Sequence, residues 1–385
     1  MQKGLSKNIV LLLLSTMLFF ASFIMLSPTF SLYVKSMGGN EGIAGLLTGL
    51  LTLAAIFLRT YFAKLADQKG RKFVLYLAGI ASITAPLLYM VDLGFWFVAL
   101  VRVYHSISVA AYVATSQTLL ADLAIPETRG STVALYGVAA GTSSAIAPYV
   151  AFSIIESKGF PTLFMLSAGI AVLMTSVIAL IKEPPVVVRD KKAPSTSLKE
   201  IVSDAWILVP SITIFSLMFA QGAVNAFLPL HGAKVGLENV GIFFSLSAVL
   251  SIIYRLGTGY LSDKIGGRRI LMPALALTVV GILSLIGLPR YAMLIMAAVL
   301  TSFGFSAAHT VLLTIIVDKT QVQKRAQAVT FFTNAWDLGT SLGAMGLGAL
   351  ALYSYSALWS TVALGVLAGF IVTVRFLPRS TAGNV

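Results

Sequence analysis

Twelve long apolar stretches make up most of this sequence, and a spanning helix needs about 20 mostly apolar residues. Short clusters of charge, Gly and Pro separate the stretches. We place them at residues 8–34, 42–64, 73–91, 95–120, 131–153, 162–182, 205–230, 239–261, 270–288, 291–317, 327–350 and 356–376. Helices are predicted because lipid offers no partner to backbone polar groups. The period-two alternation of a membrane barrel strand is absent from these stretches.

The composition excludes the soluble enzyme classes. Apolar residues make up 58% of the 385 residues and charged residues only 11%, against about 25% charge in a soluble domain. The chain has no cysteine, which excludes disulfides, thiolate catalysis and cysteine-held metals. The first stretch follows Lys3 and Lys7 as a signal peptide would, but it is too long for one and is predicted to be the first spanning helix.

The distribution of the basic residues along the chain indicates how it is oriented in the membrane. Of 27 Lys and Arg, we count 20 at the termini and in even-numbered gaps, four in odd-numbered gaps and three inside helices. The positive-inside rule then places both termini in the cytoplasm of a multi-pass cell-membrane protein. The net charge of +13 is explained by this topology and requires no nucleic acid.

An internal repeat divides the chain into two halves. A fixed offset of 196 pairs Arg59 with Arg255, and the same offset pairs further residues along about 70 positions. These further pairs are Leu65/Leu261, Asp67/Asp263, Gly70/Gly266, Lys72/Arg268, Asp122/Asp318 and Arg129/Arg325. We therefore predict six-helix bundles at 1–182 and 205–385, joined by a cytoplasmic linker at 183–204, an arrangement typical of transporters.

Residues 63–72 (AKLADQKGRK) resemble the signature loop between the second and third helices of the major facilitator superfamily. Residues 259–268 (GYLSDKIGGR) form a second copy, with Gly267 at the position of the first arginine. The resemblance implies an all-α membrane fold of twelve helices in two pseudo-symmetric six-helix bundles. Within the superfamily, the stretch from Arg102 to Tyr136 is most similar to bacterial proton-coupled efflux members.

The signature loops are expected to form a conformational latch at the cytoplasmic face. In the first half we expect Gly70 to take a positive φ, Asp67 to cap a helix end, and Arg71 to pair with Asp122. Lys72 completes this set. In the second half Gly266 repeats the turn, and Asp263 and Asp318 are expected to join either Arg268 or Arg269. The alternative is ordinary charge at a membrane face.

Arg102 and His105 lie inside the fourth stretch, three residues apart and so on one helix face. Residues 100–106 (LVRVYHS) resemble the fourth-helix motif of the superfamily, in which the Arg is thought to tune a nearby carboxylate. A histidine titrates near neutral pH, which suits proton coupling. The alternative is that Arg102 reaches outward to the headgroups while His105 bonds a neighbouring carbonyl.

Asp337 lies about ten residues into the eleventh stretch, where an ionised carboxylate is expensive unless it is paired, hydrated or protonated. It is predicted to exchange a proton or to bind a cationic substrate. The alternative is a structural pair with Arg59, Arg255 or His309. Further candidates for the cavity wall share a polar or aromatic side chain near the midplane. They are Tyr33, Tyr112, Gln117, Tyr136, Gln221, Asn225, Phe227, His309, Asn334 and Trp336.

The sequence therefore predicts a secondary active transporter, most simply a proton-coupled exporter of small amphipathic, cationic or zwitterionic compounds by alternating access. It would act as a monomer in lipid, driven by the proton gradient, with no cofactor or metal. The alternative is an uptake symporter or a facilitator of a small metabolite, because fold alone does not decide direction. Enzyme motifs are absent from the membrane stretches, and the two-half repeat disfavours a channel.

Overall fold

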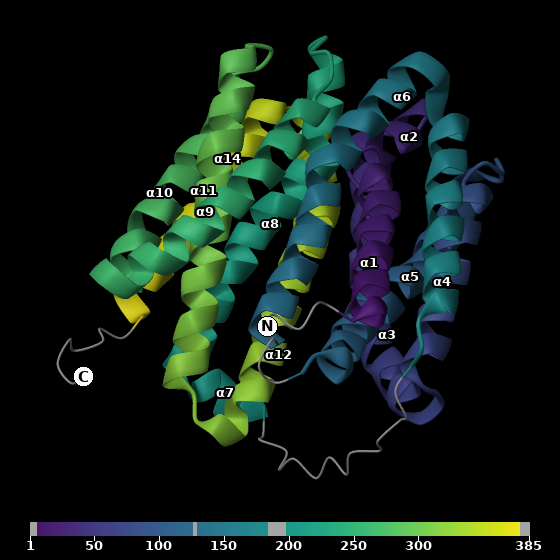
Figure 1. The fold of residues 1–385 in the computed structure, drawn as a ribbon. Coiled ribbons are helices and arrows are strands. Elements are labelled where there is room, and N and C mark those ends of the chain that lie inside the picture. The colour runs from purple at the N-terminus through teal and green to yellow at the C-terminus, as the bar shows by residue number, and fades with distance from the viewer. Residues whose placement is uncertain (1–5, 126–128, 184–197, 378–385) are drawn as a thin grey trace. The chain divides into compact units, whose positions relative to one another are not determined.

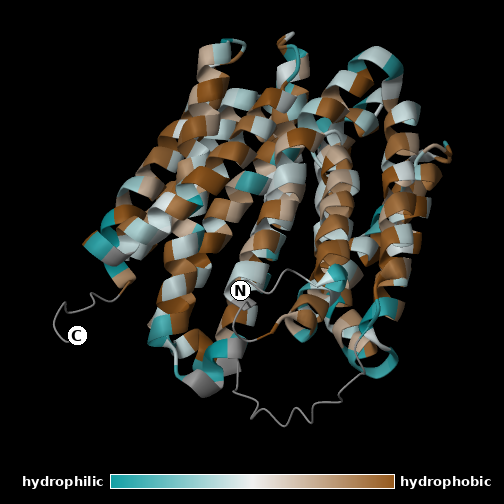
Figure 2. Cartoon of the chain, in the orientation of Figure 1, coloured by the Kyte–Doolittle hydropathy of each residue, from teal (hydrophilic) through white to brown (hydrophobic). Residues whose placement is uncertain are grey.

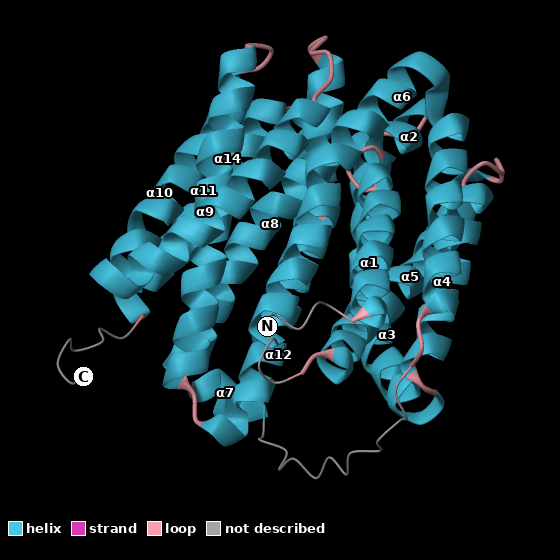
Figure 3. Ribbon diagram, in the orientation of Figure 1, coloured by secondary structure: helices cyan, strands magenta, loops and turns pink. Residues whose placement is uncertain are grey.

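The computed structural model describes residues 6–125, 129–183 and 198–377, and in these ranges every regular element is a helix (Figure 1, Figure 3). The helices of the first part are α1 Lys7–Leu26, α2 Phe30–Ser36, α3 Glu41–Lys69, α4 Arg71–Leu88, α5 Gly94–Leu123 and α6 Arg129–Leu180. Those of the second part are α7 Leu198–Ser203, α8 Ala205–Lys234, α9 Gly241–Ile265, α10 Gly267–Ser284, η2 Leu285–Gly287, α11 Tyr291–Lys319, α12 Val322–Met345, α13 Gly348–Tyr353 and α14 Tyr355–Phe376.

Ten helices in the described ranges are long and apolar enough to span a membrane, with α1 and α2 counted together as one span. Figure 2 shows apolar residues along these helices and hydrophilic residues gathered at many helix ends. The element α6 comprises two helices that meet at a kink at the non-helical Gly159, with φ 77°, and these correspond to the fifth and sixth predicted stretches. Helix α12 corresponds to the eleventh stretch and is more polar than the ten. The all-α membrane fold is thus confirmed.

Polar side chains cap the N-termini of helices α1 and α3. The Ser6 hydroxyl accepts from the Ile9 amide at 3.4 Å, and the Asn40 side chain accepts from the Ile43 amide at 2.9 Å. These bonds satisfy amides that have no partner inside the helix.

The described chain forms two compact units. Unit 1 comprises residues 1–190 with 225–249, and unit 2 comprises 191–224 with 250–385. The boundaries between the units therefore also pass through α8 and α9, so that residues 225–249 of these helices group with the first part of the chain. The division into bundles at 1–182 and 205–385 stays a prediction.

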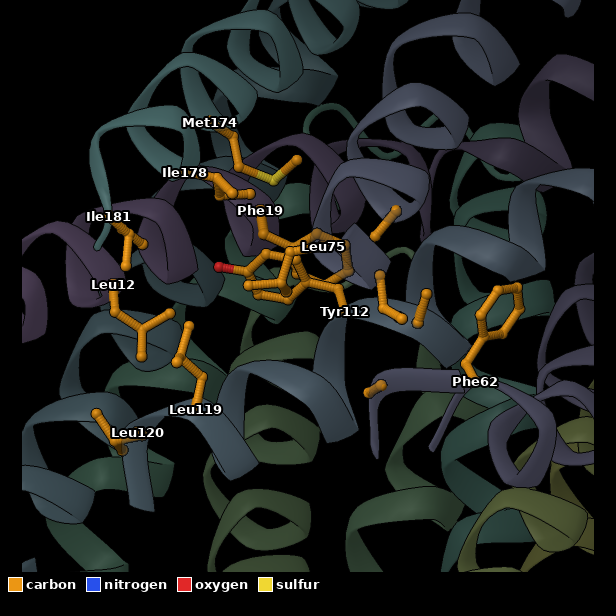
Figure 4. Close-up of a cluster of buried hydrophobic side chains, with 14 of the residues drawn as sticks. Leu12, Phe19, Phe62, Leu75, Tyr112, Leu119, Leu120, Met174, Ile178 and Ile181 are labelled. Carbon is orange, nitrogen blue, oxygen red and sulfur yellow. The ribbon is translucent and has the colours of Figure 1, made fainter. Parts of the chain in front are cut away.

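A buried hydrophobic cluster holds α1, α3, α4, α5 and α6 together in unit 1 (Figure 4). Its centre is Phe19, whose ring stacks on that of Tyr112 with the centroids 4.0 Å apart. Leu12, Leu75 and Leu119 are fully buried around this pair. Burying these side chains between the helices, away from lipid or water, adds dispersion contacts along the interfaces of the helices in unit 1.

Unit 2 is held partly by close approach of helix backbones. Gly339 and Gly343 of α12 lie against α8, and a Cβ added to them would overlap the carbonyl oxygens of Phe215 and Phe219 respectively. Gly222 of α8 lies equally close to the carbonyl of Thr340. The spacing of Gly339 and Gly343 is that of small residues which let membrane helices pack tightly. This crossing fixes α12, the helix that carries Asp337.

Candidate functional site

The turn between α3 and α4 carries the first signature loop. Gly70 has φ 97° and ψ 154°, a conformation open almost only to glycine. The turn places Arg71 so that its Nη2 lies 3.1 Å from Asp67 Oδ1 and its Nε lies 3.2 Å from Asp122 Oδ2. A third bond runs from Arg71 Nη1 to the Ala66 carbonyl at 2.9 Å. The expected Arg71–Asp122 pair and positive φ at Gly70 are therefore present.

Two further contacts belong to this cluster. Asp67 pairs with Arg71 one turn away, because the side chain of Arg71 folds back over α3. The role of Asp67 as a helix cap stays a prediction. The α4 N-terminus is capped by Glu183. Its Oε1 accepts from the Arg71 amide, and its Oε2 accepts from the Lys72 amide at 3.3 Å. Lys72 Nζ donates to the carbonyls of Ala179 and Ile181 at 2.7 and 2.8 Å.

The second signature loop keeps the turn but forms a different contact. Gly266 has φ 86°, as Gly70 does. Arg268, expected beside Asp318, instead donates to the carbonyls of Leu377 and Val374 at 2.8 and 3.0 Å. Asp318 is exposed at the end of α11. The side chain of Asp263 lies outside the described residues.

Gly267 explains the difference between the two loops. It occupies the position of Arg71 and has no side chain that could bridge carboxylates. A Cβ there would lie 2.8 Å from a methyl group of Val311, so the helix packing leaves no room for a larger residue. Among the described side chains of the second loop, Arg268 thus contacts carbonyls where Arg71 of the first loop contacts carboxylates.

Arg102 is buried in α5, with 3% of its surface exposed. Its Nε and Nη2 donate to the carbonyls of Leu47 and Thr48 in α3, both at 2.9 Å. Its guanidinium also lies 3.8 Å from the ring centroid of Phe30, a cation–π distance. The alternative in which Arg102 reaches outward is wrong, because its donors are used inside the helix bundle.

His105 is buried one turn further along α5. Its Nδ1 lies 3.3 Å from the Tyr89 hydroxyl, so its partner is a side chain rather than the neighbouring carbonyl of the alternative. The Tyr33 hydroxyl donates to the Tyr89 backbone carbonyl. Arg102, His105, Tyr89 and Tyr33 thus form a buried polar cluster beside α2, α3 and α5.

A second polar group lies in unit 2. Asp337 is partly buried in α12, 15 positions after Val322 begins the helix. One residue before it, Trp336 lies edge-on to the His309 ring of α11, with the centroids 5.0 Å apart. The ring centroid of Phe332 lies 6.1 Å from that of His309. The structure therefore brings His309 and Trp336 together, and Asp337 follows Trp336 in α12.

The predicted cavity residues differ in burial. Tyr112 is fully buried in the unit 1 core and bonds Ser15 Oγ at 2.8 Å. Phe227 is also fully buried, and Tyr136 is 7% exposed and bonds Ser116 Oγ at 2.9 Å. Gln117 and Asn334 are exposed, whereas Gln221 and Asn225 are partly buried in α8.

Two cavities of unit 1 have none of these candidates in their walls. The first, of about 210 Å³, lies between α1 and α6 and has an apolar lining that includes Met17 and Ala147. The second, of about 300 Å³, lies where α6 meets the end of α8 and includes Glu156. Within the described ranges no three His, Asp or Glu side chains gather where they could hold a metal ion.

A family model described as the Major Facilitator Superfamily matches residues 12–289 and 238–385. The chain belongs to the Major Facilitator Superfamily. It is therefore a multi-pass membrane transporter of a small-molecule substrate and not an enzyme, and members of this superfamily usually work as monomers.

Two relatives within the superfamily are similar along nearly their whole length. The staphylopine export protein of Staphylococcus aureus is 23% identical over 388 residues, which cover 95% of this chain and 94% of the relative. The multidrug resistance protein MdtG of Enterobacter lignolyticus is 21% identical over 391 residues, which cover 98% and 93%.

Solved structures show the same superfamily fold. A bacterial homologue of the human lysosomal transporter Spinster matches with a TM-score of 0.80 at 16% identity, covering 99% of this chain and 100% of that one. The xylose transporter XylE from E. coli matches with a TM-score of 0.75 at 16% identity, covering 97% and 96%.

Proposed function

We propose that this superfamily member exports small amphipathic, cationic or zwitterionic compounds in exchange for protons, by alternating access. The observation that carries the proposal is Asp337, a partly buried carboxylate in α12, the helix that corresponds to the eleventh predicted stretch. A carboxylate in that position is costly when ionised, so it favours binding either a proton or a cation. Competition between the two for one carboxylate would couple proton entry to substrate exit.

Two further observations support this proposal. Arg102 and His105 place a second polar cluster within the membrane span of α5. In addition, two relatives that are similar along nearly their whole length bear names of export and multidrug resistance. The proton gradient would supply the driving force, with the chain in the cell membrane and both termini in the cytoplasm.

Purified protein in liposomes with an imposed pH gradient tests the proposal. An interior acid gradient should drive organic cations into vesicles from outside, and collapse of the gradient with an ionophore should stop accumulation. Accumulation of the same cations without a gradient would contradict proton coupling. Protease digestion of a tag on the C-terminus, in sealed cells and in inverted vesicles, tests the cytoplasmic placement.

An uptake symporter or facilitator of a small metabolite is the second candidate. Its support is the likeness of fold to the xylose transporter XylE, which covers 97% of the chain, since one fold serves both directions of transport. Exchange of a labelled metabolite across the liposome membrane, unchanged between pH 5.5 and 8, would identify a facilitator.

A further inference from the structure

Glu183 is the first residue of the predicted linker and the last residue of the described range 129–183, and it does not belong to the signature loop in sequence. It nevertheless lies against that loop, 112 positions from Arg71. Its carboxylate oxygens accept from the successive amides of Arg71 and Lys72 at the start of α4. A helix of 18 residues presents unpaired amides and a partial positive charge at this end. A carboxylate is the group that satisfies both.

Gly70 leaves room for the Glu183 carboxylate because it has no side chain. A Cβ at position 70 would lie 3.1 Å from each of the two Glu183 oxygens. The glycine therefore serves both the left-handed turn, with φ 97°, and the close approach of Glu183. An alanine would strain the backbone and press on the carboxylate at the same time.

The segment around Glu183 is fixed from two sides. Asn8 and Lys182 exchange a pair of hydrogen bonds, from Asn8 Nδ2 to the Lys182 carbonyl and from the Lys182 amide to Asn8 Oδ1, both at 3.1 Å. Lys72 holds the carbonyls of Ala179 and Ile181. The end of α6 is thus joined to the starts of α1 and α4, and Glu183 is held in one place over the turn.

The second half of the repeat supplies an internal comparison. At the offset of 196, Lys72 corresponds to Arg268 and Ile181 to Leu377, and the bond between side chain and carbonyl is present in both pairs. Glu183 corresponds to Arg379 and Arg71 to Gly267. A cation at position 379 has the wrong sign for a helix N-terminus. The bond that anchors the helix end occurs in both halves, whereas Glu183 and Arg71 occur together in one half only.

We propose that Glu183 is a positioning residue of the Arg71–Asp122 cluster. By holding the amides of Arg71 and Lys72, its carboxylate fixes the backbone from which the Arg71 guanidinium reaches Asp67 and Asp122. Arg71 must leave and re-form those pairs as the transporter changes conformation, and Glu183 sets the geometry to which it returns. The proposal rests on alternating access, and not on the substrate, the direction or the coupling ion.

Two readouts on Glu183→Ala and Glu183→Gln test the proposal together. The first is amide hydrogen exchange of the 70–73 segment, which needs no substrate. Protection should fall about tenfold or more in Glu183→Ala, the effect of losing a charge-assisted hydrogen bond. Glu183→Gln should lie between, because an amide oxygen accepts from one N–H while its NH₂ group opposes the other. Unchanged exchange in both variants would overturn the contact.

The second readout is transport in liposomes, separated into kcat and KM. Turnover should fall about tenfold in Glu183→Ala with KM unchanged, because Glu183 acts on conformational change and not on binding. Glu200→Gln is the matched control. It removes an exposed carboxylate that pairs with Lys324 at 2.7 Å and should leave turnover unchanged.

Each outcome decides between roles. Lost protection with wild-type turnover would make Glu183 a helix cap only and overturn its place in the cluster. A raised KM with unchanged kcat would equally overturn it. If the wild-type protein fails to transport the chosen cation, the proposed substrate class fails, while the exchange result for Glu183 still stands.

Discussion

Arg71 and Asp122, 51 positions apart in the chain, are joined by an ion pair of 3.2 Å from Nε to Oδ2. The same guanidinium contacts Asp67 one turn before it. The Arg71 side chain is 10% exposed and that of Asp122 is 28% exposed, so the pair is partly shielded from screening by salt. One arginine therefore links the ends of α3, α4 and α5.

A double-mutant cycle on this pair should show strong coupling. Arg71→Ala and Asp122→Ala should each lower turnover, and the double variant should be little worse than either alone. We expect a coupling energy of about 1–2 kcal/mol in the free energy of activation. The exposed pair Lys324–Glu200 serves as the control cycle, for which about 0–1 kcal/mol is expected. Additive losses at Arg71 and Asp122 would show that the pair does not act as a unit.

Replacing Arg102 by methionine should separate function from stability. The carbonyls of Leu47 and Thr48 lie inside α3 and keep their helical bonds when the guanidinium is removed. Loss of a buried charge is often neutral or stabilising. We expect the midpoint of thermal unfolding to stay within a few degrees while transport falls about a hundredfold. Arg102→Lys should not restore transport. An ammonium lacks the planar guanidinium group that donates to both carbonyls and lies against the Phe30 ring. Normal transport by Arg102→Met would assign the residue to structure alone.

Asp337→Asn should abolish proton-driven transport without unfolding the protein. The amide has nearly the same volume but neither binds a proton nor carries charge at neutral pH. The measurement is accumulation in liposomes under an imposed pH gradient. Asp92→Asn, which changes an exposed carboxylate between α4 and α5, is the control and should behave as wild type. Gradient-driven accumulation by Asp337→Asn at the wild-type rate would contradict the proposed role of Asp337 in proton coupling.

Gly343→Ala should destabilise unit 2. Its Cβ would overlap the carbonyl of Phe219, so α12 and α8 would have to move apart. Overpacking of this kind costs about 1–3 kcal/mol. Gly137→Ala is the matched control in α6, since a Cβ there meets nothing within 4 Å, and alanine is the better helix former. The midpoint of thermal unfolding in detergent should fall in the first variant and hold or rise in the second. Equal midpoints would refute the close crossing.

Tyr112→Phe tests the placement of this residue in the core. The change removes a hydroxyl that bonds Ser15 at 2.8 Å, while Ser15 keeps its own bond to the Leu12 carbonyl. We expect a loss of about 1 kcal/mol in the free energy of unfolding and no change in KM for any substrate. An altered KM would return Tyr112 to the cavity wall.

The sequence predicted the fold and the first signature loop well, because both depend on local signals. Apolar length specifies spanning helices directly. Gly70 is flanked by charged residues, which specifies a tight turn. The offset of 196 pairs Asp122 with Asp318 just as it pairs Gly70 with Gly266, which associates Asp122 with the first signature loop. At Arg268 the repeat itself holds, since this side chain donates to the Leu377 carbonyl as Lys72 donates to the Ile181 carbonyl. The expectation of a contact with Asp318 is based on Arg71, whose position in the second loop is occupied by Gly267.

The depth and direction of side chains could not be predicted in the same way. In membrane helices the faces toward lipid and toward the core are both apolar, so hydrophobic periodicity does not separate them. Tyr112 therefore resembled a cavity residue although it packs on Phe19. Glu183 was missed because its contact with Arg71 spans 112 positions. The break predicted between residues 153 and 162 agrees with the kink that the structure places at Gly159, inside the element labelled α6.

The paired hydrogen bonds between Asn8 and Lys182 have a consequence for the connectivity of the chain. They bring the first turn of α1 and the end of α6 together, so the polypeptide from residue 8 to residue 182 returns to its own starting point. The covalent link that follows is then not needed to hold the end of α6 in place. A change of chain length between residues 184 and 197 should therefore leave the contact between α1 and the end of α6 intact. A chain lengthened there by a flexible insert should fold with only a small entropic cost.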